Sequence, residues 1–93
     1  MQIEEFEHGK TRIMAEAREA LRRLGIDQHS VMFDLHSIHP HPDGATLTVS
    51  AAGGSARGWF SAEEIRDSRE RIGRSEVRER IAALAAGLTE AVA

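Results

Sequence analysis

The sequence predicts an α+β fold, in which a two- or three-stranded antiparallel meander is packed on one face by helices. Apolar residues alternate with polar ones over Val31 to Ala51, as in a half-buried β-hairpin, whereas the flanking sequence repeats its apolar residues with helical spacing. A chain of 93 residues, 41% of them hydrophobic, corresponds to a single domain over 1–93 with one core. The expected element order is α-β-β-(β)-α-α.

The first element is an amphipathic helix predicted over Gln2 to Leu24. Lys10 interrupts its apolar stripe, and Gly9 costs up to about 1 kcal/mol in a helix interior. We therefore expect the first two turns to fray or to form a separate segment. Gly25 predicts the helix end, because it suits the left-handed residue of a Schellman motif in which Ile26 contacts the last turn. The stripe consists of Ile3, Phe6, Ile13, Met14, Ala17, Leu21 and Leu24.

A β-hairpin is predicted next, with its tip at His39-Pro40-His41-Pro42-Asp43-Gly44. The tip contains Pro42-Asp43-Gly44, a sequence typical of a type I turn. Because Gly53-Gly54 can fold the chain back again, residues 56–60 are a candidate third strand. The hairpin residues expected to face the helices are Val31, Phe33, Leu35, Leu47 and Val49.

Two helices are predicted after the sheet. Ser61 and Glu64 have the spacing of a capping box, which predicts a helix start. The apolar residues on the two sides of Gly73 would lie about 130° apart on one continuous helix. We therefore predict a break near Gly73 and a last helix over about Glu76 to Val92. The apolar residues of this last helix are Val77, Ile81, Leu84 and Leu88.

Histidines at the hairpin tip form the first candidate site. Imidazole and carboxylate groups are ligands for zinc and for other divalent transition metals such as nickel and copper. His39 and His41 project to the same side of an extended strand, and His36 to the other. An alternative interpretation is a solvent-exposed hairpin tip, since the turn-forming residues Pro42-Asp43-Gly44 account for this segment without a metal. A third interpretation is a loop that responds to pH or contacts a partner. The candidate ligands are His36, His39, His41 and Asp43.

The side of the sheet that points away from the helices is the second candidate site. Strand alternation places Met32 and Ile38 on it, together with Trp59 if Phe60 faces the helices. Exposed apolar residues among hydroxyl groups are typical of a protein interface. The alternative is that the predicted helix 2–24, or a loop, covers this side.

Composition bears on the remaining functions. A formal net charge of −3 disfavours nucleic acid and anionic membranes as partners. The absence of Cys excludes disulfides, thiolate metal sites and thiol nucleophiles. An acidic start and no long apolar run lead us to expect a cytoplasmic protein. No phosphate-binding loop or serine-nucleophile motif is present, although an enzyme with scattered acid and base residues leaves no local pattern.

Two resemblances to known groups of proteins bear on function. The element order resembles that of double-stranded RNA-binding domains, which implies RNA binding through lysines that open the helix after the sheet. This chain has Ser61-Ala62-Glu63-Glu64 at that point, and carboxylates repel phosphates. From the first helix through HPHPDG to GWFSAEEI, the chain resembles small uncharacterised proteins of Burkholderia-type bacteria grouped as a domain of unknown function, which implies no activity.

The function that the sequence favours is that of a small non-catalytic interaction or accessory protein. It would bind a protein partner, or a second copy of itself, through the outer side of the sheet. The alternative from a different class is a metal-binding protein that uses the histidine tip.

Overall fold

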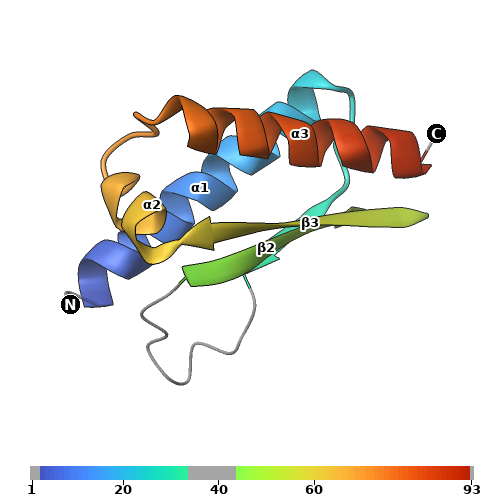
Figure 1. Cartoon of the computed structure of the whole chain (residues 1–93). Coiled ribbons are helices and arrows are strands. Elements are labelled where there is room, and N and C mark those ends of the chain that lie inside the picture. Colours follow the sequence, from blue (N-terminus) through green and yellow to red (C-terminus); the bar gives the residue numbers. More distant parts are fainter. Residues whose placement is uncertain (1–2, 34–43, 93) are drawn as a thin grey trace.

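The computed structural model describes residues 3–33 and 44–92 and confirms the predicted α+β fold, including the third strand (Figure 1). The three strands form one antiparallel meander in the order β1-β2-β3. In chain order the described elements are α1 (Ile3–Arg23), β1 (Ser30–Phe33), β2 (Gly44–Ala51), β3 (Gly54–Ser61), α2 (Ala62–Asp67) and α3 (Ser75–Val92).

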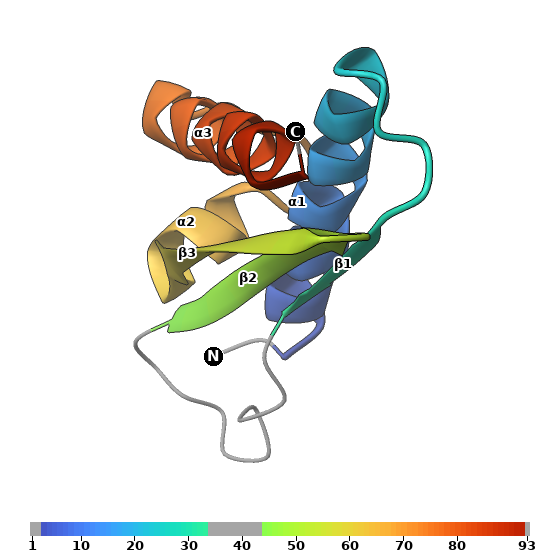
Figure 2. The same cartoon turned by 90° about the vertical axis from the view of Figure 1, so that its right-hand side faces the viewer.

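The elements form two layers, with the sheet in one and the helices in the other. Figure 2 shows the helices on one face of the sheet, with α1 near β1 and α3 above β3. The register pairs Val31 with Val49 and Phe33 with Leu47, so that these four residues face the helices together. All four are buried in one core, as the alternation predicts. Leu35, predicted to join them, lies outside the described residues.

Gly9 lies within an uninterrupted α1, so the expectation of a frayed or separate first segment is wrong. A Cβ atom added at Gly9 would overlap the backbone carbonyl group of Ile65 in α2. Only a residue without a side chain fits where the two helices cross. The glycine that weakens the isolated helix is therefore required by tertiary packing.

Lys10 interrupts the apolar stripe of α1 and yet is only 8% exposed. Its Nζ lies 3.1 Å from the Glu7 carboxylate and 5.2 Å from the centre of the Phe6 ring. An ammonium group in this position retains an ion pair and a cation–π contact while its methylene chain covers apolar surface. Lys10 thus packs as part of the helix face that the sequence pattern predicts to be apolar.

The end of α1 is a Schellman motif, as predicted. The Ile26 amide donates to the Leu21 carbonyl at 2.9 Å, and the Gly25 amide donates to the Arg22 carbonyl at 2.9 Å. Gly25 has φ +84°, the left-handed conformation that this motif requires. The chain therefore turns sharply toward β1.

The helix that follows the sheet is shorter than expected. The predicted break lies near Gly73, whereas α2 already ends at Asp67. Ser68 is the C-cap residue of α2. Its hydroxyl donates to the Glu64 carbonyl at 2.7 Å and its amide donates to the Ile65 carbonyl at 3.1 Å. The amide bond reaches back three residues instead of the four of an α-helix, which tightens the last turn of α2 where the helix ends. The last helix begins at Ser75, in agreement with the prediction.

Small residues of β3 allow α3 to approach the sheet closely. A Cβ atom added at Gly58 would lie 3.1 Å from the Leu84 side chain, and one added at Gly54 would lie 2.6 Å from Ala91 Cβ. Gly87 of α3 is less restricted, since a Cβ atom added there would lie 3.8 Å from Ala56 Cβ, an ordinary contact distance. α3 therefore packs directly against the backbone of β3.

Candidate interaction surface

The face of the sheet that points away from the helices is called the outer face below. Its register places Met32 beside Thr48 and Thr48 beside Arg57, while Thr46 pairs with Trp59. Arg57 is the single charged residue among those that the structure describes on this face. The described residues of the outer face are Ser30, Met32, Thr46, Thr48, Ser50, Ser55, Arg57 and Trp59.

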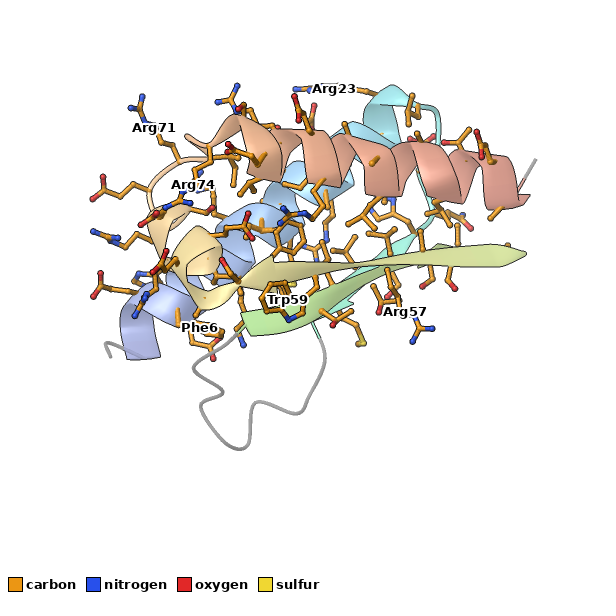
Figure 3. All side chains as sticks on the ribbon, in the orientation of Figure 1. Phe6, Arg23, Arg57, Trp59, Arg71 and Arg74 are labelled. Atoms are coloured by element: carbon orange, nitrogen blue, oxygen red, sulfur yellow. The ribbon has the colours of Figure 1, made fainter. Side chains whose placement is uncertain are left out.

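Met32 and Trp59 are both 53% exposed. Figure 3 shows Trp59 and Arg57 on the side of the sheet away from α3. The alternative in which the first helix covers this side is wrong, because α1 packs with α2 and α3 on the opposite face. Ile38, the third predicted contact residue, lies outside the described residues.

Arg57 is an addition to the predicted contact residues. The signal for it in the sequence is its two-residue spacing from Trp59, which puts both side chains on the same face of a strand. Its guanidinium group has no ion-pair or aromatic partner in the described part of the chain. A long cationic side chain is thus available on the outer face beside an exposed indole.

The indole of Trp59 lies across β2 against Gly44. A Cβ atom added at Gly44 would be 2.7 Å from Trp59 Cζ2, and Gly44 has φ +147°. Both observations require glycine at the start of β2. An aromatic ring over a cross-strand glycine is a recurrent stabilising arrangement in sheets. It holds Trp59 in place while about half of the side chain stays accessible.

Phe60, the next residue, has the opposite environment. It is fully buried, and its ring packs edge-on against Phe33 with 6.2 Å between the ring centres. The Arg80 guanidinium carbon lies 5.1 Å from the centre of the Phe60 ring. The two aromatic residues therefore belong to different surfaces, one to the core and one to the outer face.

The capping box at the end of β3 is present as predicted. The Ser61 amide donates to Glu64 Oε1 at 2.9 Å, and the Glu64 amide donates to Ser61 Oγ at 3.1 Å. Arg80 of α3 donates to the same Glu64 oxygen at 2.8 Å. Burial raises the pKa of the Glu64 carboxyl, but the bonds from Arg80 and Ser61 outweigh burial and hold this pKa below its ordinary value. These contacts join β3, α2 and α3.

A shallow hollow lies at the start of α3, lined by Arg71, Gly73, Ser75 and Arg78. Arg78 Nε donates to the Ile72 carbonyl at 2.8 Å, so this side chain fixes the loop before α3. Guanidinium groups stay protonated in proteins and do not exchange protons with a substrate near neutral pH. The lining of the hollow thus contains no pair of a general acid and a general base.

The predicted metal ligands His36, His39, His41 and Asp43 lie outside the described residues. Within 3–33 and 44–92, no three His, Asp or Glu side chains come together as metal ligands would. Among the same residues, none of the helices combines the length and apolar character needed to cross a membrane.

Comparison of this chain with models of known protein families, with curated proteins and with solved structures finds no significant match.

Proposed function

We propose that this protein is a small non-catalytic interaction or accessory protein, which binds a protein partner through the outer face. The observation that carries the proposal is the pair Met32 and Trp59, each 53% exposed on a sheet face without a helix over it. Apolar side chains exposed on the surface of a folded domain gain free energy when a partner removes them from water.

The composition of the outer face supports this proposal. Tryptophan, methionine and arginine are enriched at protein interfaces, whereas carboxylates are depleted there. The described outer face has Met32, Arg57 and Trp59 among serine and threonine hydroxyls, and none of its described residues is an Asp or Glu. Hydroxyl groups satisfy their hydrogen bonds with a partner or with trapped water at low cost. The face is thus suited to being covered.

Site-specific photo-crosslinking in the native host tests the proposal. Met32 is replaced by the photoreactive residue p-benzoylphenylalanine, which leaves Trp59 in place as part of the surface. Leu24 is the matched control position, because it is 49% exposed and lies beyond the end of α1, on the helix side of the sheet. Illumination of the Met32 variant is expected to yield a discrete adduct with a protein, and the Leu24 variant is expected to yield none.

The mass of the adduct identifies the partner class, since a second copy doubles the mass of the chain and another protein gives a different increment. Absence of an adduct at position 32, or the same adducts from positions 32 and 24, would contradict a binding role for the outer face.

A further inference from the structure

β3 is an edge strand without the features that usually keep an edge unpaired. It pairs with β2 on one side over all eight of its residues, in a register without a bulge. It contains neither Pro nor Lys, and Arg57 is its only charged residue. Long, regular edges of this kind pair with further strands, and natural proteins normally block them. In the described part of the chain, nothing pairs with the other side of β3.

The backbone groups at this open edge belong to every second residue. The Ser61 amide donates to the Glu64 side chain and therefore points away from β2. Because the amide and carbonyl of one residue in an antiparallel strand point to the same side, and neighbours alternate, those of Ser55, Arg57 and Trp59 also point to the open edge. These are also the β3 residues whose side chains lie on the outer face.

A second copy of β3 can pair with this edge antiparallel, about a two-fold axis. The two β3 strands pair over nearly their whole length if the two-fold axis passes through Arg57 or through Gly58. An axis at Arg57 places two guanidinium groups directly opposite each other, which is destabilising. An axis at Gly58 instead places Arg57 of each copy opposite Trp59 of the other, where a cation–π contact is favourable. In this register Ser61 lies opposite Ser55 of the other copy, and because the Ser61 amide already donates to Glu64, one backbone hydrogen bond is missing at each end of the seam.

We propose that two copies of this chain associate through the free edges of β3, with the two-fold axis at Gly58, to form one sheet that runs across both copies. This inference goes beyond the proposed function, because the second copy pairs at the edge of β3 and leaves Met32, on the opposite edge strand β1, open to a different protein. The two outer faces join into one, and each exposed indole receives the guanidinium of the other copy.

α3 packs over β3 and so lies beside the proposed seam. α3 contacts β3 through Leu84, Gly87 and Ala91, and its buried Val77, Ile81 and Leu88 continue this face away from Gly87, within about 60° of Leu84. β3 therefore lies under one flank of α3. In the second half of that flank Ala83, Gly87 and Ala91 follow one another at four-residue spacing, whereas in the first half Arg80 is held over Phe60 by its bond to Glu64.

Sedimentation equilibrium of the full chain with two complementary variants tests the proposal. The native chain is expected to be a dimer at micromolar concentrations. Arg57→Glu and Trp59→Lys each remove both cross-copy contacts, and each alone should raise the dimer dissociation constant roughly tenfold or more. An equimolar mixture of the two variants should recover dimerisation. A mixed dimer places the introduced glutamate opposite the introduced lysine on one side of the axis, and it keeps the native pair of Arg57 and Trp59 on the other.

Arg71→Glu is the matched control, since it makes the same charge change at an exposed position in the loop before α3. It should leave the dimer unchanged. A mixture of Arg57→Glu with the native chain distinguishes the two axes: it should dimerise more weakly than the native chain for an axis at Gly58, and more strongly for an axis at Arg57.

A native chain that stays monomeric up to millimolar concentration, or variants that do not recover on mixing, would overturn the dimer. Stronger dimerisation of the mixture with the native chain would overturn the Gly58 axis. None of these results removes the outer face as a surface for a different protein, because Met32 lies on β1, at the far edge from this seam, and its crosslinking is read independently.

Discussion

The two faces of the sheet differ most clearly at Trp59 and Phe60, which are neighbours in the chain. Phe60 is fully buried between Phe33 and Arg80, whereas Trp59 is 53% exposed and rests on Gly44. Strand alternation alone sends the two rings to opposite sides. The helices then cover only one side of the sheet, so that the Phe60 ring is part of the core and the Trp59 ring stays accessible to a partner.

This difference separates folding from binding. Apolar area buried on the helix side stabilises the folded chain itself, at roughly 25 cal/mol per Å². The exposed part of Trp59 contributes nothing comparable to the isolated chain, and its burial can stabilise only a complex. A substitution on one face should therefore change the free energy of unfolding, and a substitution on the other should change association.

The largest effect is expected at Phe60. Phe60→Ala leaves a cavity in the core and should lower the free energy of unfolding by about 3–5 kcal/mol. The matched variant is Trp59→Ala, for which a loss within about 1 kcal/mol is expected at an exposed site. Urea unfolding followed by far-ultraviolet circular dichroism, at dilutions where the chain is monomeric, measures both variants without relying on tryptophan. Equal losses at the two positions would contradict the assignment of the rings to different surfaces.

A smaller effect is expected at the crossing of α1 and α2. Gly9→Ala should lower the free energy of unfolding by about 1–3 kcal/mol, because the new methyl group meets the Ile65 backbone. Gly87→Ala is the control, since its methyl group would meet Ala56 at an ordinary contact distance of 3.8 Å. There, better helix propensity should stabilise the protein by up to about 1 kcal/mol. A stabilising Gly9→Ala would mean that the helices are not in close contact.

The features of the fold that the sequence could predict are local, and those that it could not predict depend on tertiary contacts. The Schellman motif at Gly25 and the capping box at Ser61 could be predicted because each depends on groups within a few residues of each other. The presence of Gly9 inside a continuous α1 depends on the contact with Ile65, far along the chain. The ion pair of Glu64 with Arg80 likewise joins residues that are distant in sequence. No local pattern carries that information.

The outer face also has features that the sequence could predict and features that it could not. Alternation could predict that Met32 and Trp59 share the outer face, since side-chain direction in a strand is local. Whether a helix covers that face is a tertiary property, and only the structure shows that α1 packs on the other side. The contact between Trp59 and Gly44 depends on strand register, which the sequence does not state.

A modest effect is expected at the capping box. Ser61→Ala removes the acceptor for the Glu64 amide and should cost about 1 kcal/mol, typical of a lost N-cap. Ser61→Asp keeps an acceptor there and should recover most of the stability. Thermal or urea unfolding of both variants at neutral pH is the measurement. Equal stability of the alanine variant and the native chain would show that α2 does not need its cap.

The smallest effect is the dependence of stability on pH through Glu64. Its pKa is lowered in the folded chain, so its ionised form stabilises the fold above the ordinary glutamate pKa of 4.5, and this contribution is lost as the pH falls through the lower folded value. Glu64→Gln should therefore lose less stability than the native chain between neutral and strongly acidic pH. Parallel stability curves for the two proteins would contradict a role for the contacts with Arg80 and Ser61.

Trp59 reports directly on whether the folded chain leaves its outer face open, because it is the only tryptophan. The measurement is tryptophan emission and acrylamide quenching of the native chain, first at dilutions where it is monomeric and then at rising concentration. We expect red-shifted, readily quenched emission at dilution, with protection developing only as a partner copy binds. Blue-shifted emission that is protected from acrylamide in the dilute monomer would show instead that the chain covers this face on its own, and an open binding surface would then be ruled out.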